Sequence, residues 1–131
     1  MRRHRIITTG ILLAATLPGL QPAAAQEIYM GKFDQRSGEE LFKNICQGCH
    51  MPDARGATGA GTYPALAANA KLAAAVYPIT VVLHGQRAMP TFADMLDDEQ
   101  IASVVNYVRT HFGNRYKDQV TAEAVRALRQ K

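Results

Sequence analysis

The sequence is poor in cysteine and shows no repeat, low-complexity block or second-domain linker. Its 2 cysteines are too few for the disulfide framework that staples many small exported domains. A zinc knuckle would need further Cys or His ligands at metal spacing, which the chain does not offer. No strand-type alternation surrounds the cysteines, which disfavours a thioredoxin-like redox pair. These absences favour one small domain without a disulfide scaffold.

The chain also has little excess charge once its N-terminal arginines are set aside. Lysine and arginine total 15 against 11 acidic residues, which gives a net charge of +4. Arg2, Arg3 and Arg5 account for most of that excess, so the remainder is nearly balanced. The high isoelectric point therefore predicts neither a nucleic-acid partner nor an anionic membrane surface.

The N-terminal segment has the pattern of a secretory signal. A basic stretch that ends at Arg5 precedes an apolar run at 6–20, and Ala23-Ala24-Ala25 then offers an A-x-A cleavage site. A retained anchor is the alternative, but Pro18 and Gly19 interrupt an apolar run that is already short for a membrane span. We predict a cleaved signal peptide at 1–25, a mature domain at 26–131, a periplasmic location and no stable membrane span after cleavage.

The motif Cys46-Gln47-Gly48-Cys49-His50 is typical of a c-type haem attachment site. Each thiol adds across one haem vinyl group to form a thioether, and the spacing of the cysteines matches the spacing of the vinyls. The next residue then lies under the iron, where the imidazole can become the proximal ligand. The sequence therefore predicts one haem c per chain, bound covalently by Cys46 and Cys49, with His50 as an axial ligand of the iron.

The rest of the chain has the pattern of helices joined by loops, with no convincing strand. Ser37 and Glu40 form a capping box that opens a helix leading into the haem motif. A later apolar series follows the 3.6-residue period. After an irregular lead-in at 26–36, the expected elements are the helix that Ser37 caps, a Gly/Pro-rich loop at 51–64, an Ala-rich helix at 66–76, a helix from Pro78 to Gly85, a long helix from Asp97 or Asp98 to Gly113, and a short helix that Thr121 caps. The predicted fold class is all-α.

The ligand on the other side of the iron decides what such a haem can do. The side chains that offer a sulfur or imidazole donor there are Met30, Met51, Met89, Met95, His84 and His111. Met89 lies in a loop between two helices, and Pro90 stiffens this loop, so the sulfur is presented at low entropic cost. Met51 is held on the proximal face, and Met30 precedes the first helix.

We therefore predict Met89 as the distal axial ligand, with Met95 and then His84 as the alternatives. His84 has a competing structural role at a helix end, and His111 is expected at the surface. Ligation by histidine and methionine favours ferrous iron and fills the coordination sphere, which suits one-electron transfer better than catalysis.

With these features the chain resembles the class I cytochrome c family over residues 37–112. The shared order is a helix ending in Cys46-x-x-Cys49-His50, then Tyr63-Pro64-Ala65-Leu66, then Met89-Pro90-Thr91-Phe92, then a final helix. The resemblance implies the cytochrome c fold, with helices packed around one covalently bound haem.

The resemblance also assigns roles to particular residues. It implies that Gly38 and Phe42 of the first helix pack against Val104 and Tyr107 of the last, where glycine allows close approach. It further implies that the Pro64 carbonyl accepts the Nδ1–H of His50 and so orients this ligand. Residues proposed for the haem propionates are Arg87 and Tyr63, with a solvated surface arginine as the alternative for Arg87.

The predicted function is that of a periplasmic one-electron carrier and not an enzyme. The alternative is the cytochrome c subunit of a periplasmic dehydrogenase, which the extension at 113–131 favours by its similarity to small monohaem subunits of such enzymes. A haem enzyme or gas sensor is a third possibility, and it would require an open or easily displaced sixth ligand position on the iron. Expected partners are periplasmic redox proteins: a dehydrogenase donor and a terminal oxidase or other acceptor. The basic residues do not form the dense lysine ring of mitochondrial cytochrome c, so strong steering to an acidic oxidase is not expected.

Overall fold

The computed structural model describes residues 33–59 and 61–130. The predicted signal peptide and the candidate ligand Met30 lie outside the described residues. The elements are α1 (Gly38–Leu41), η1 (Phe42–Cys46), α2 (Gln47–His50), β1 (Ala57–Thr58), β2 (Thr62–Tyr63), η2 (Ala70–Ala73), α3 (Val76–His84), α4 (Asp98–Thr110) and α5 (Ala122–Arg129). The described chain is mostly helical, as predicted. No helix in the described ranges has the length and apolar character needed to cross a membrane.

The first three elements form one continuous helical segment. Ser37 caps it, because its hydroxyl accepts a hydrogen bond from the Glu40 amide at 3.2 Å. The middle part, η1, is a π-helical turn that the sequence pattern does not predict. The segment ends where Met51 takes a positive φ of 65°. Such π turns are frequent at functional sites, and this one ends at Cys46, the first cysteine of the motif.

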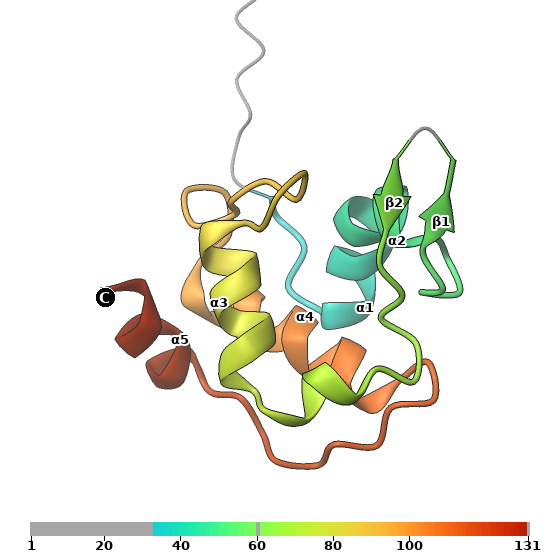
Figure 1. Cartoon of the computed structure of the whole chain (residues 1–131). Helices are drawn as coiled ribbons and strands as arrows, with labels where there is room; N and C mark the ends of the chain where they lie inside the picture. Colours follow the sequence, from blue (N-terminus) through green and yellow to red (C-terminus); the bar gives the residue numbers. More distant parts are fainter. Residues whose placement is uncertain (1–32, 60, 131) are drawn as a thin grey trace, which may run out of the picture.

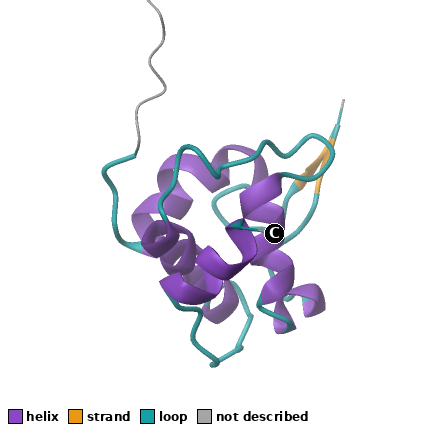
Figure 2. Ribbon diagram, turned by 90° about the vertical axis from the view of Figure 1, so that its left-hand side faces the viewer, coloured by secondary structure: helices purple, strands orange, loops and turns teal. Residues whose placement is uncertain are grey.

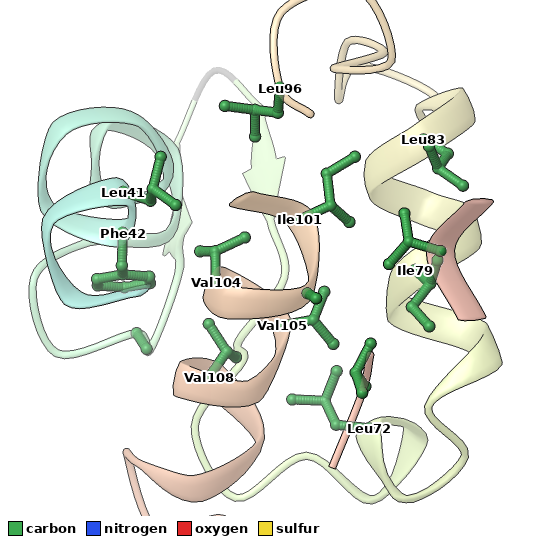
Figure 3. Packing of buried hydrophobic residues seen from close by; sticks show 14 residues of the cluster. Leu41, Phe42, Leu72, Ile79, Leu83, Leu96, Ile101, Val104, Val105 and Val108 are labelled. Atoms are coloured by element: carbon green, nitrogen blue, oxygen red, sulfur yellow. The ribbon is translucent and has the colours of Figure 1, made fainter. Parts of the chain in front are cut away.

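Helix α4 is the central element of the core. Figure 3 shows Ile101, Val104, Val105 and Val108 of α4 between Leu41 and Phe42 on one side and Ile79 and Leu83 of α3 on the other. Asp97, one of the two helix starts that the sequence leaves open, caps α4 and forms a full capping box with Gln100. Thr121 likewise caps α5, which packs its buried Val125 toward α3 and α4. In Figure 1, α3 and α5 lie on one side of α4, and α1 and α2 lie on the other.

The α1–α4 contact is close because residue 38 has no side chain. A Cβ atom at Gly38 would lie 2.3 Å from the Ser103 carbonyl oxygen and 2.6 Å from the Tyr107 Cβ. The Phe42 ring packs against Tyr107 with 5.8 Å between centroids. This is the packing that the family resemblance implies for the first and last helices of the fold.

The Gly/Pro-rich loop contains a short antiparallel hairpin that the sequence pattern does not predict. Strands β1 and β2 pair Ala57 with Tyr63 and Thr58 with Thr62. Figure 2 shows these strands at the edge of the helical body. The expectation of a structure without strands is thus corrected by this small sheet, while the all-α class is retained.

The Ala-rich segment 66–76 is not the continuous helix that was expected. Only η2 forms there, because the backbone groups before it have other partners. The amides of Leu66 and Ala67 both donate to the Ala54 carbonyl, at 2.7 and 2.9 Å. The Asn69 side chain then caps η2 by accepting from the Lys71 amide at 3.0 Å. Side-chain caps of this kind compete with helix formation, and here they override alanine's helix propensity.

Two helix boundaries also differ from the prediction. Helix α3 begins at Val76, so Pro78 is its third residue and not its first. Proline is tolerated there because the amides of the first turn need no intrahelical partner. Helix α4 ends at Thr110, three residues short of Gly113. Phe112 leaves the helix with a φ of 55° and packs its ring 4.7 Å from that of Phe42.

A buried arginine ties the segment after α4 to the body of the fold. Arg109 is fully buried, and its guanidinium donates to the carbonyls of Leu72 at 2.9 Å and Ala73 at 3.0 Å. It also donates to both carboxylate oxygens of Asp118 at 2.7 Å. Both of these bonds come from Nη2. Hydrogen bonds between charged groups are stronger than neutral ones, and Asp118 balances a charge that would otherwise be buried alone.

We expect Asp118→Asn to lower the free energy of unfolding at neutral pH and to lose that deficit in acid. The hydrogen bond from Arg109 lowers the pKa of Asp118 from its usual 3.8. A lowered pKa stabilises the fold above the unfolded-state pKa, and this stabilisation disappears as the pH falls through the folded-state value. Urea unfolding at neutral pH and below pH about 3 measures both limits. Asp53→Asn, which removes an exposed pair with Arg55, is the control, and an equal pH response in both variants would contradict the prediction.

Candidate haem site

The haem motif lies at the C-terminal end of the first helical segment. Cys46 is half-buried at the end of η1, whereas Cys49 on α2 is exposed. His50 is the last residue of α2 and is only 8% exposed. One helical turn thus presents two thiols and one imidazole, in the order that the sequence motif predicts.

His50 is oriented by a backbone carbonyl. Its Nδ1 atom lies 2.9 Å from the Pro64 oxygen, the contact that the family resemblance implies. A histidine whose Nδ1–H donates to a carbonyl carries its free lone pair on Nε2, and the bond also makes that nitrogen a better donor to a metal. The side chain is therefore prepared to bind an iron atom through Nε2.

A glycine that the sequence analysis did not single out makes the His50–Pro64 contact possible. Gly56 donates its amide to the His50 carbonyl at 3.0 Å and has a positive φ of 68°. A Cβ atom at this position would lie 2.1 Å from the Tyr63 carbonyl oxygen and 2.8 Å from the Pro64 carbonyl carbon. Only glycine fits here, so Gly56 lets the chain at Pro64, directly after β2, approach the histidine. In the sequence, Gly56 is only one of several glycines in a predicted loop, and that pattern is too weak to identify its role.

The loop at 85–97 between α3 and α4, here called the methionine loop, has a fixed backbone around Met89. The amides and carbonyls of Gln86 and Met89 form two mutual hydrogen bonds of 3.0 Å, and Met89 is half-buried. Behind this turn, Gly85 ends α3 with a φ of 73°, where a Cβ would lie 2.6 Å from the Met89 carbonyl oxygen. In Figure 1, α3 with this loop and α2 with the hairpin stand on opposite sides of the view, and α4 lies behind them.

The methionine loop is also attached to the end of α3. The Thr91 hydroxyl donates to the Leu83 carbonyl at 2.5 Å, and the Phe92 amide donates to the Val82 carbonyl at 3.0 Å. The last carbonyls of a helix have no intrahelical partners, so these bonds satisfy them. Thr91 and Phe92 thereby fix the chain directly after Met89 and Pro90.

The other candidates for the distal ligand differ in their exposure. Met51 and Met95 are half-buried, and His84 is exposed at the end of α3. His111 is an exposed residue, with its Nδ1 atom 2.8 Å from the Tyr107 carbonyl oxygen and its ring stacked on that of Tyr107. Of the residues suggested for the propionates, Arg87 is exposed and Tyr63 is 40% exposed.

The chemistry of the cysteines fits a covalently attached haem better than a thiolate metal site. Burial, together with the neighbouring Cys49, raises the pKa of Cys46 to about 12. A thiolate at this position would be disfavoured at neutral pH, whereas a thioether is uncharged and tolerates burial. Within the described residues, no cluster of at least three His, Cys, Asp or Glu side chains is arranged to hold a metal ion.

Comparison with known proteins identifies related domains. Residues 33–108 match the family described as cytochrome C oxidase, cbb3-type, subunit III. The fructose dehydrogenase cytochrome subunit of Gluconobacter japonicus is 32% identical over 107 residues, covering 70% of this chain and 22% of the relative. The alcohol dehydrogenase (quinone) cytochrome c subunit of Gluconacetobacter polyoxogenes is 31% identical over 121 residues, covering 82% and 25%.

A third relative has a length similar to that of this chain. Cytochrome c-552 of Thermus thermophilus is 33% identical over 118 residues, which cover 74% of this chain and 87% of the relative. By contrast, the chain spans only about a quarter of the length of the two dehydrogenase subunits. The similarity to those subunits therefore covers only a part of each of them.

Proposed function

This chain belongs to the c-type cytochrome family described as cytochrome C oxidase, cbb3-type, subunit III, and from that premise we propose that it is a one-electron carrier. In this proposal Cys46 and Cys49 hold one haem c through thioethers, and His50 and Met89 are the axial ligands of its iron. When bound, the haem supplies a reversible one-electron couple between ferric and ferrous iron, and methionine ligation raises its potential.

The contact between His50 Nδ1 and the Pro64 carbonyl oxygen, at 2.9 Å, is the observation that carries the proposal. It leaves Nε2 of a buried imidazole as the free donor, next to two cysteines at the spacing of haem attachment. The fixed turn around Met89 supplies a second donor of the type that suits electron transfer. The relatives named as cytochrome subunits and as cytochrome c-552 agree with an electron-transfer role.

The haem-loaded protein is expected to give a reversible one-electron wave and, when oxidised, a methionine-to-iron charge-transfer band. Both follow from a filled coordination sphere with one thioether ligand. Voltammetry and near-infrared or red absorption measure them, and the haem content per chain follows from the same spectra. A reduced protein that binds carbon monoxide at once would contradict the proposal and favour a haem enzyme or gas sensor.

We also propose that the protein works in the periplasm after cleavage of residues 1–25. The support is the basic, apolar and A-x-A pattern of that segment and membership of a family whose haem is attached covalently. N-terminal sequencing of the protein from a periplasmic extract tests this, with Gln26 as the expected first residue. Retention of the segment in a membrane fraction would contradict the proposed location.

A second candidate function is that of a fixed cytochrome subunit in a dehydrogenase. The observation that favours it is the similarity to the cytochrome subunits of fructose and alcohol dehydrogenases. Both functions use the same haem chemistry, so the distinction lies in the partner. Native size-exclusion chromatography separates them: a stable complex that reduces the haem when substrate is added favours the subunit, and a monomer favours the free carrier.

A further inference from the structure

Helix α5 reaches the loop that carries the proposed methionine ligand. Its packing depends on the buried Val125 and the half-buried Leu128, which face α3 and α4. Figure 1 shows the chain crossing below the body after α4 and returning beside α3 to form α5. Arg129, the last residue of α5, is only 27% exposed. This low exposure indicates a structural contact, because most surface arginines are far more exposed.

The Arg129 guanidinium binds three acceptors around the methionine loop. Nη1 donates to the Ala93 carbonyl, and Nη2 donates to the Leu96 carbonyl at 3.0 Å. Nε donates to the Asp98 carboxylate at 2.8 Å, and this carboxylate is only 16% exposed. The planar fork of arginine can serve such divergent acceptors at once, which lysine cannot do. The Asp98 carboxylate balances the positive charge of the guanidinium that the two carbonyls contact.

These carbonyls connect directly to the segment around Met89. The Met95 and Leu96 amides both donate to the Phe92 carbonyl, at 3.1 and 2.9 Å. Phe92 in turn donates to the Val82 carbonyl at 3.0 Å. The stretch after Met89 is therefore held at one end by α3 and at the other by Arg129. Without Arg129, the second attachment would be lost and two partly buried carbonyls would lack a partner.

We propose that Arg129, paired with Asp98, is a positioning residue for the Met89 ligand. It keeps the methionine loop closed and so limits the fraction of molecules in which the sulfur has left the iron. The inference rests on the proposed His50/Met89 ligation and gives a role to the α5 segment. An external ligand binds only to the open fraction, so its apparent affinity reports that fraction.

Imidazole titration of the oxidised, haem-loaded protein tests the role of Arg129. Arg129→Gln is expected to raise the apparent affinity for imidazole about tenfold, because charged hydrogen bonds to two carbonyls are lost. The methionine-to-iron band should disappear in parallel with imidazole binding, at lower imidazole concentrations than in the wild type. The titration follows the exchange of methionine for imidazole by absorption, so it does not depend on any electron-transfer activity.

Arg126→Gln is the matched control. Arg126 lies on the same helix and donates to the same carboxylate, Asp98, at 3.2 Å, and this is its only side-chain hydrogen bond within the described residues. The variant removes the same charge without removing a bond to the methionine loop, so its imidazole affinity should stay near that of the wild type. Equal affinities in the two variants, whether raised or unchanged, would overturn the proposal.

Two further measurements keep the outcomes distinct. Arg129→Lys retains the charge toward Asp98 but not the fork, so its imidazole affinity should fall between those of the wild type and Arg129→Gln; it also replaces Arg129→Gln if that variant does not fold. Urea unfolding of each variant measures global stability. If a loss of global stability accounts for the change in imidazole affinity, the proposal is also overturned. A wild-type protein without the methionine band would instead contradict Met89 ligation, the proposed function itself.

Discussion

Met89→Ala in the haem-loaded protein is expected to abolish the methionine-to-iron band and to lower the reduction potential by on the order of 0.1–0.2 V. A thioether is a soft, weak donor that favours ferrous iron, and a harder ligand in its place favours ferric iron. The fixed turn around residue 89 should limit any rearrangement that brings another side chain to the iron, because Gly85, Thr91 and Phe92 hold the backbone on both sides. Voltammetry and absorption of the oxidised protein measure the two effects.

Met95→Ala is the control for this prediction. Met95 lies on the same loop, is half-buried like Met89, and is the next candidate for the distal ligand. Its replacement should leave the band in place and shift the potential little. If the band persists in Met89→Ala and disappears in Met95→Ala, the ligand is Met95 and the proposed assignment is wrong. A Met89→Ala protein that does not bind added imidazole more readily would also contradict it.

The parts of the site that depend on short-range sequence could be predicted. The Cys46–His50 motif depends on spacing within one helical turn, and a methionine followed by proline in a loop depends on neighbouring residues alone. The His50–Pro64 contact came from the family resemblance, and the distance of 2.9 Å fits it. The assignment of iron ligands to these residues stays a prediction that the variants above are designed to test.

The parts that depend on long-range packing could not be predicted. Arg129 donates to Ala93, which lies 36 residues earlier in the chain, and nothing in the local pattern of α5 indicates that partner. Gly56 has its role only because the chain at Tyr63 and Pro64 returns against it. A pattern of residues reports the face of a helix, but not which distant carbonyl a side chain on that face will meet.

The same distinction explains the fold. The starts of three helices follow from caps that act within four residues. The predicted caps Ser37 and Thr121 are confirmed, and of the two residues that the sequence offered for the long helix the structure selects Asp97. The expected helix at 66–76 fails because tertiary partners take its backbone groups. One of them is Asn114, whose side chain accepts from the Asn69 amide at 2.9 Å and donates to the Leu66 carbonyl at 2.8 Å. Alanine's helix propensity is weaker than these partly buried hydrogen bonds.

Gly38→Ala is expected to lower the free energy of unfolding by about 2–3 kcal/mol and the thermal midpoint by roughly 10–20 °C. The added Cβ would lie 2.3 Å from the Ser103 carbonyl oxygen and 2.6 Å from the Tyr107 Cβ. Both atoms are fixed in the middle of α4, so neither can move aside without separating the two helices. The loss should exceed the small gain in helix propensity that alanine brings. Thermal and urea unfolding of the haem-loaded protein, followed by circular dichroism, measure it.

Gly48→Ala is the matched control, because Gly48 is also helical and a Cβ there would meet nothing within 4 Å. This change should leave stability equal or raise it by about 0.5–1 kcal/mol, the usual difference between glycine and alanine in a helix. The contrast between the two variants isolates the effect of space from the effect of propensity. Equal unfolding midpoints for Gly38→Ala and Gly48→Ala would mean that α1 and α4 can shift apart at little cost, and that the close contact at Gly38 does not limit the packing of the fold.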